Sequence, residues 1–174
     1  MEEEINELKK RVKENPDNMN NWMELAHMYY EIGKLDKAID SYMQSLKLDP
    51  KNAPLWHNLG YIYNEKGDFE NAIKNLKKAL KFNPKLAISW TELSYAYLEA
   101  GKYKKTIEVC KKALELSPKD ETAWINSGSA FYNLKEYDKA IEAAKKALQI
   151  VPGLDFAKIV LDLAEKAKER VNSE

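Results

Sequence analysis

The residues able to do chemistry are few and scattered in this 174-residue chain. Its histidines are His27 and His57, and its single cysteine is Cys110. Catalysis by a nucleophile needs a base and an orienting group beside it, and no such arrangement is evident in the sequence. There is also no glycine-rich phosphate loop and no cluster of histidine and cysteine with zinc spacing. The sequence therefore predicts a non-enzymatic protein without a metal or a cofactor.

These isolated residues have simple interpretations. One cysteine cannot form an intrachain disulfide, so Cys110 is interpreted as a small buried hydrophobic residue. The two histidines are interpreted as solvated or peptide-contacting imidazoles, and an adventitious metal site that includes Glu24 is the alternative for them.

The charges argue against nucleic acid as the partner. The chain has 28 acidic and 28 basic residues, which balance to a formal net charge of zero, whereas nucleic-acid binders usually carry a basic excess. Four lysine pairs are present, and we interpret them as parts of a solvated outer face. These pairs are Lys77-Lys78, Lys104-Lys105, Lys111-Lys112 and Lys145-Lys146.

No uninterrupted apolar run is long enough to cross a membrane. The first residues are acidic and lack the apolar core of a secretion signal. We therefore expect a cytoplasmic protein with no membrane partner.

The elements that position these residues follow from an internal period of 34 residues. Tryptophan recurs at Trp22, Trp56, Trp90 and Trp124. Proline keeps the same interval at Pro16, Pro50, Pro84, Pro118 and Pro152. A fixed period of this length indicates one supersecondary unit that is copied and stacked. Counted from three residues before each tryptophan, the units start at Met19, Ala53, Ala87 and Glu121.

Each unit has the pattern of two helices. Position 8 is always small, position 11 aromatic, position 21 isoleucine and position 28 leucine, and these spacings follow the helical period. Gly33, Gly67 and Gly101 stand where the first helix should end, and glycine readily takes the left-handed C-cap conformation. The proline at position 32 ends the second helix.

This pattern resembles the tetratricopeptide repeat (TPR), whose signature is Trp-x-x-Leu-Gly-x-x-Tyr, then Ala-x-x-x-Phe, then Pro. Repeat two matches it at Trp56, Leu59, Gly60, Tyr63, Ala72 and Pro84. The resemblance implies an all-α fold, a right-handed α-solenoid of stacked antiparallel helix pairs. We expect repeats at 19–52, 53–86, 87–120 and 121–154, with capping helices at 1–18 and 155–174.

The caps should cover the ends of the stack. Ile5, Leu8 and Val12 form the apolar side of the first cap. The second cap is expected to use one apolar face, formed by Phe156, Val160, Leu163, Ala164, Ala167 and Val171.

The resemblance also implies a binding groove, because the first helices of such repeats line a concave surface. The implied groove residues are Met23, Glu24, His27, Tyr30, His57, Asn58, Tyr61, Thr91, Glu92, Tyr95, Leu98, Ile125, Asn126, Ser129 and Tyr132. The first-helix segments contain no lysine or arginine, but they carry Glu24, Glu31, Glu65, Glu92 and Glu99. The groove should therefore be aromatic, rich in amides and mildly acidic.

One TPR subfamily binds acidic chaperone tails through a carboxylate clamp of lysine, arginine and asparagine. Asn58 is the only residue here that matches a clamp position, and Glu92 would repel a carboxylate. The sequence therefore predicts that chaperone tails of this type are not partners.

Taken with the family, these features predict an adaptor that binds protein or peptide segments, preferably neutral or basic ones with apolar anchors. Two alternatives stay open. The chain could be a structural or self-associating module of a larger assembly, or an engineered repeat scaffold without a native ligand.

Overall fold

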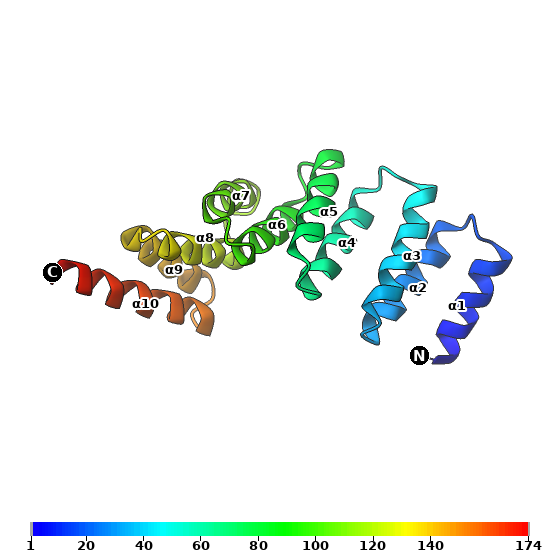
Figure 1. Cartoon of the computed structure of the whole chain (residues 1–174), viewed down its shortest axis with the longest axis horizontal. Helices are drawn as coiled ribbons and strands as arrows, with labels where there is room; N and C mark the ends of the chain where they lie inside the picture. The colour runs from blue at the N-terminus through cyan, green and yellow to red at the C-terminus, as the bar shows by residue number, and fades with distance from the viewer. Residues whose placement is uncertain (1, 174) are drawn as a thin grey trace. The chain divides into compact units, whose positions relative to one another are not determined.

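The structure is a computed structural model that describes residues 2–173 (Figure 1). All regular secondary structure in this range is α-helical. The helices are α1 (Glu2–Glu14), α2 (Met19–Glu31), α3 (Leu35–Leu48), α4 (Ala53–Glu65), α5 (Phe69–Phe82), α6 (Ala87–Glu99), α7 (Tyr103–Leu116), α8 (Glu121–Asn133), α9 (Tyr137–Ile150) and α10 (Asp155–Asn172). We call α2, α4, α6 and α8 the first helices, because each begins where a sequence unit begins, and α3, α5, α7 and α9 the second helices.

Short polar side chains begin several of the first helices. The side chains of Asn18, Asn52 and Asp120 accept hydrogen bonds from backbone N–H groups in the first turns of α2, α4 and α8. These N–H groups have no partner within the helix, so a side-chain oxygen at this position stabilises the start of the helix.

Left-handed residues end the first helices. Gly33, Gly67 and Gly101 have φ angles of 69°, 72° and 68°, and Lys135 takes the same conformation at 63°. The following amide then reaches back to the helix, as when Lys34 N–H donates to the Tyr29 carbonyl at 2.8 Å. The expected turn geometry is thus confirmed at the three glycines, and Lys135 adopts it despite its side chain.

The helices form two compact units, with the boundary between Pro84 and Lys85. In the first unit, α1 to α5, the sequence-predicted cap residues Ile5, Leu8 and Val12 are buried. Gly60 lets α4 approach α5 closely, because a Cβ atom there would lie 2.4 Å from Cγ of Leu76. The small residue at position 8 is therefore needed for helix packing in this repeat.

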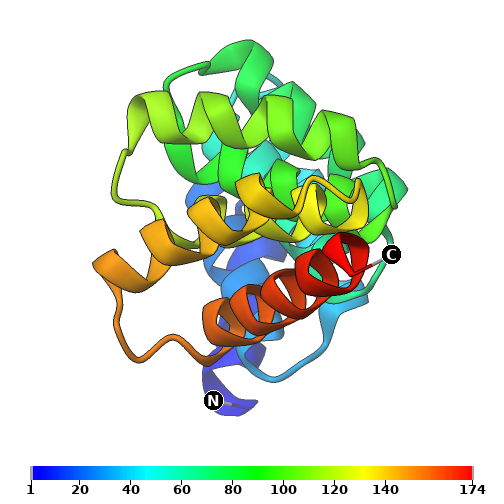
Figure 2. The ribbon, with the colours of Figure 1, turned by 90° about the vertical axis from the view of Figure 1, so that its left-hand side faces the viewer.

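The second unit, α6 to α10, has an alanine-rich core around α8, α9 and α10. Ala140, Ala144, Ala147, Ala157 and Ala164 are fully buried. Figure 2 shows α10, in red, alongside α9, in orange, and the two helices are in contact. Small side chains let these three helices pack closely.

The packing of α10 differs from our expectation. Val160 and Ala164 are buried as predicted, but Phe156, Leu163 and Val171 are exposed by 55%, 43% and 59%. The helix packs through one edge of its apolar arc, which holds Ala157, Val160 and Ala164, whereas Phe156 and Leu163 lie at the other edge. Val171 is in line with the buried edge but stands in the last turn of α10. The face with Val160 packs on Gly128, where an added Cβ atom would lie 3.4 Å from Val160 Cγ1.

A repeated ion pair shows the register of α10. Lys66 pairs with Asp36 in the first unit, and Lys168 pairs with Asp138 in the second. Each lysine stands at position 14 of a 34-residue unit, if a further unit is counted from Asp155. The helix α10 therefore follows α9 as another first helix would.

A search of the described helices finds none that combines the length and the apolarity needed to cross a membrane.

Candidate functional site

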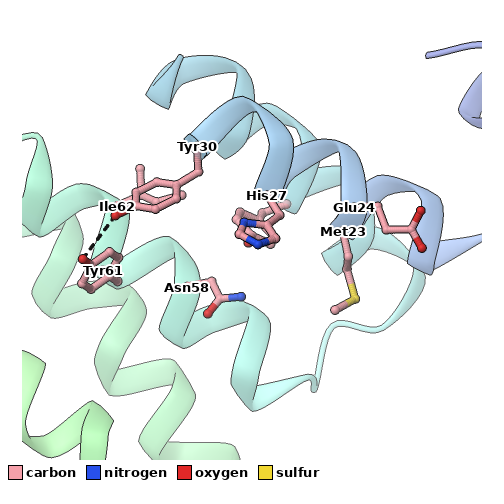
Figure 3. A pocket seen from close by; sticks show the side chains of 8 residues that line it. Met23, Glu24, His27, Tyr30, Asn58, Tyr61 and Ile62 are labelled. Atoms are coloured by element: carbon pink, nitrogen blue, oxygen red, sulfur yellow. Dashed lines mark hydrogen bonds between the residues drawn. The ribbon is translucent and has the colours of Figure 1, made fainter. Parts of the chain in front are cut away.

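The first unit contains a cavity of about 470 Å³ between α2, α3 and α4. We call it the tyrosine pocket (Figure 3). It is lined by Met23, Glu24, His27, Tyr30, Tyr42, Asn58, Tyr61 and Ile62. Its volume is within the range of about 300–1,000 Å³ that is usual for ligand sites.

Three tyrosines make the aromatic part of this pocket. Tyr30 and Tyr61 have ring centroids 5.9 Å apart at an interplanar angle of 65°. The hydroxyl of Tyr30 donates to the hydroxyl of Tyr61 at 3.2 Å, the bond that Figure 3 marks with a dashed line. Tyr42 lies deeper and shares a hydrogen bond with the side chain of Asn58, while burial raises the pKa of its phenol. The rings are thus held in place, and Tyr42 stays neutral at physiological pH.

Glu24 carries the fixed charge at the rim of the pocket. Its Oε2 atom accepts a hydrogen bond from Arg11 Nη1 at 3.1 Å, and Arg11 Nη2 donates to Asn21 Oδ1 at 2.6 Å. Arg11 and Glu24 are both about half exposed, so water screens this ion pair. His27 faces Glu31 one turn further along α2, with 3.6 Å between Nδ1 and Oε1.

The second unit contains a cavity of about 410 Å³ between α6, α7, α8 and α10. We call it the C-terminal pocket. It is lined by Leu98, Glu99, Tyr103, Ser129, Tyr132, Asn133, Phe156, Ile159, Val160 and Leu163. Leu98, Phe156, Ile159, Val160 and Leu163 offer apolar contact in this pocket, and Glu99 is the one charged residue in its lining.

The structure brings most of the predicted groove residues of the first unit to one cavity. Of the predicted groove residues in the first unit, Met23, Glu24, His27, Tyr30, Asn58 and Tyr61 line the tyrosine pocket. His57 lies outside it, and burial lowers the pKa of its imidazole.

In the second unit the structure brings together fewer of the predicted residues. Leu98, Ser129 and Tyr132 line the C-terminal pocket. Glu92 is half-buried and Tyr95 is 37% exposed, and neither lines this pocket.

Three further predicted groove residues of the second unit, Thr91, Ile125 and Asn126, are buried. Thr91 donates to Asp120 Oδ2 at 2.5 Å, and Asn126 donates to Ser94 Oγ at 2.9 Å. These bonds connect neighbouring helices, so the two polar side chains contribute to packing in this conformation.

The sequence analysis missed Phe156, Ile159 and Leu163, which line the C-terminal pocket. A signal for them existed. Counted from Asp155, Ile159 and Leu163 fall at positions 5 and 9, the positions that the predicted groove residues Met23 and His27 occupy in repeat one. They were instead assigned to the packing face of a cap or left out. Tyr42 and Ile62 were also missed, because both belong to the packing positions of their helices.

The reactive residues show no catalytic arrangement among the residues that the structure describes. Cys110 is buried, and burial raises the pKa of its thiol to about 12, so the thiolate is scarce at neutral pH. No group of three or more histidine, cysteine, aspartate or glutamate residues in residues 2–173 is placed to hold a metal ion.

Helix pairs with pockets on their first-helix side define a helical-repeat protein, and two family models identify the kind of repeat. A model described as the tetratricopeptide repeat protein 21 C-terminal ARM domain matches residues 2–124, and a tetratricopeptide repeat model matches residues 122–154. The chain belongs to the tetratricopeptide repeat family and to the all-α solenoid class.

Solved structures agree with this family. A crystal structure of MamA is 28% identical, with a TM-score of 0.80 over 84% of this chain and 85% of MamA. YrrB, described as a TPR protein with an unusual peptide-binding site, is 21% identical, with a TM-score of 0.78 over 93% of this chain and 84% of YrrB. The TPR domain of Arabidopsis OM64 is 22% identical, with a TM-score of 0.64 over 66% of this chain and 94% of the domain. At their level of identity, the last two show likeness of fold alone.

A comparison with curated protein sequences finds no match. TPR domains generally mediate contacts between proteins and are typically non-catalytic scaffolds.

Proposed function

We propose that this chain is a non-enzymatic adaptor, acting in the cytoplasm, that binds protein or peptide segments on the first-helix side of its repeats. The observation that carries this proposal is the pair of pockets, one in each unit. Most of their lining side chains come from successive first helices or from α10, which continues their register, and Tyr42 of α3 and Tyr103 of α7 complete the lining. The proposal includes the division into four repeats and two capping helices.

The two pockets support a preference for neutral or basic segments with apolar anchors. Phe156, Ile159 and Leu163 offer apolar contact in the C-terminal pocket. Apolar anchors that enter such a pocket supply most of the binding energy of many interfaces. The first helices carry glutamates and no basic residue, so an acidic segment would meet repulsion.

A peptide-display library tests this proposal with matched variants. Leu163→Glu places a charge in the C-terminal pocket, and Leu116→Glu on α7 is its control, because the two leucines are 43% and 44% exposed. Met23→Lys places a positive charge in the tyrosine pocket, and Met43→Lys on α3 is the control for it. We expect the library to yield peptides whose binding is lost in the pocket variants and kept in the controls.

Failure to enrich any peptide, or equal loss in pocket and control variants, would overturn the adaptor proposal. Self-association is the second candidate, because apolar side chains of α10 are exposed. Sedimentation at increasing concentration distinguishes it: a dimer that Leu163→Glu dissociates and Leu116→Glu leaves intact would favour a structural module.

A further inference from the structure

The chemistry of the tyrosine pocket is specific enough to name the group that it takes. Its walls are the rings of Tyr30, Tyr42 and Tyr61, with the carboxylate of Glu24 at the rim. Aromatic rings attract cations through the negative potential of their faces. A nearby carboxylate adds to this attraction, whereas an anion would be repelled by both.

We propose that the tyrosine pocket holds the side chain of a lysine or arginine from the bound partner segment, an inference that rests on the proposed function. The alkyl part of such a side chain packs along Met23, and its charged end lies against the tyrosine rings. The carboxylate of Glu24, at the other end of the pocket in Figure 3, adds a longer-range attraction. Asn58 lies on α4, across the pocket from Met23 and His27 of α2 in Figure 3, and its amide can hydrogen-bond the partner's backbone.

The carboxylate of Glu24 already binds a guanidinium of this chain. Arg11 contacts Glu24 and Asn21 through its two terminal nitrogens. Arg11 therefore competes for Glu24, and its exposed position means that a partner's cation can displace it. Elsewhere in the chain an ammonium group lies over a tyrosine ring: Lys37 Nζ is 5.6 Å from the centroid of Tyr29, a cation–π contact.

The two pockets then differ in what they select. No lysine or arginine is among the residues that line either pocket, and each lining set contains three aromatic residues and one glutamate. All three aromatic residues of the tyrosine pocket are tyrosines, whereas the C-terminal pocket adds the aliphatic side chains of Leu98, Ile159, Val160 and Leu163. The C-terminal pocket takes an apolar anchor, and the tyrosine pocket takes a basic one.

An NMR titration of the whole chain with blocked tripeptides tests the inference. The central residue, flanked by glycines, is lysine, arginine, norleucine or glutamate. Norleucine keeps the alkyl chain of lysine without its charge. We expect lysine and arginine probes to shift amide signals of α2 and α4 and to bind about tenfold more tightly than the norleucine probe. The glutamate probe should bind most weakly.

Variants separate the cation site from a merely apolar cavity. Tyr61→Leu keeps apolar volume but removes a ring, so it should lower the affinity for lysine to the level of norleucine. Tyr137→Leu, at a tyrosine of α9 that lines neither of the two pockets, is the control and should leave the affinity for lysine unchanged. Arg11→Ala removes the internal competitor and should raise the affinity for lysine about two- to threefold, as expected for an exposed ion pair. Thermal unfolding checks that each variant is folded.

Equal binding of the norleucine and lysine probes, an unchanged affinity in Tyr61→Leu, or no shift in α2 and α4 would overturn this inference. The adaptor proposal is judged separately, because library peptides that depend on Leu163 would still support it.

Discussion

The indole Nε1 of Trp56 donates a hydrogen bond to the backbone carbonyl of Pro50, at a distance of 2.9 Å. The same bond joins Trp22 to Pro16 at 2.8 Å and Trp124 to Pro118 at 3.1 Å. It connects the loop before a first helix to the first turn of that helix. Tryptophan and proline therefore share one period because they are the two ends of one contact.

Replacing Trp124 by phenylalanine should lower the free energy of unfolding by about 1–2 kcal/mol, from the lost hydrogen bond and the smaller ring. Chemical denaturation measures the change. Benzothienylalanine at the same position, which has the shape of tryptophan without the N–H donor, is the control. If it restores full stability, the hydrogen bond contributes nothing and packing explains the whole effect.

Gly60→Ala should destabilise the chain by about 1–3 kcal/mol, because the new methyl group would overlap Leu76 in α5. Gly128→Ala is the matched case in α8. Its Cβ atom would lie 3.4 Å from the nearest atoms, which is ordinary contact. There we expect no loss, or a gain of up to about 1 kcal/mol from the higher helix propensity of alanine. Equal effects of the two substitutions in urea unfolding would contradict this reading of the packing.

Lys135→Gly should stabilise the second unit by about 1 kcal/mol, because Lys135 has a φ angle of 63°, which is unfavourable for a residue with a Cβ atom. Gly67→Ala tests the reverse change in the first unit. Nothing lies within 4 Å of an added Cβ there, so the expected loss of about 1 kcal/mol would come from the backbone alone. The melting temperatures of the two variants test both expectations. A lower melting temperature for Lys135→Gly would show that the lysine side chain compensates for the backbone strain.

His57 should make the chain less stable in acid. Burial lowers its pKa in the folded state below the ordinary value of 6.5. As the pH falls below 6.5, the imidazole of His57 takes up a proton more readily in the unfolded chain than in the folded chain. The free energy of unfolding therefore decreases as the pH decreases. His57→Gln should reduce the loss of melting temperature between about pH 7 and pH 5. His27→Gln is the control, because the side chain of His27 is 64% exposed. A steeper or unchanged slope in His57→Gln would show that other groups cause the acid sensitivity.

The sequence by itself determined the repeats, the helical class and the turns between helices. Each depends on residues close in the chain: Asn52 caps α4 three residues away, Gly67 ends it, and Trp56 reaches Pro50 six residues back. Local hydrogen bonds and backbone preferences are encoded by residue type and spacing, so a period of 34 residues is enough to identify them.

Only the tertiary structure decided which groove positions are accessible. Thr91 and Asn126 fall at groove positions by count, yet each is buried against a partner on a neighbouring helix. Tyr42 comes from a second helix and still lines the tyrosine pocket, while Phe156 and Leu163 on α10 line the C-terminal pocket instead of packing inside a cap. These outcomes depend on the rotation and separation of whole helices, which are set by the sizes of side chains on different helices, such as Gly60 against Leu76. A repeat count assigns a residue to a face of its helix, but the packing of neighbouring helices decides whether that face is open.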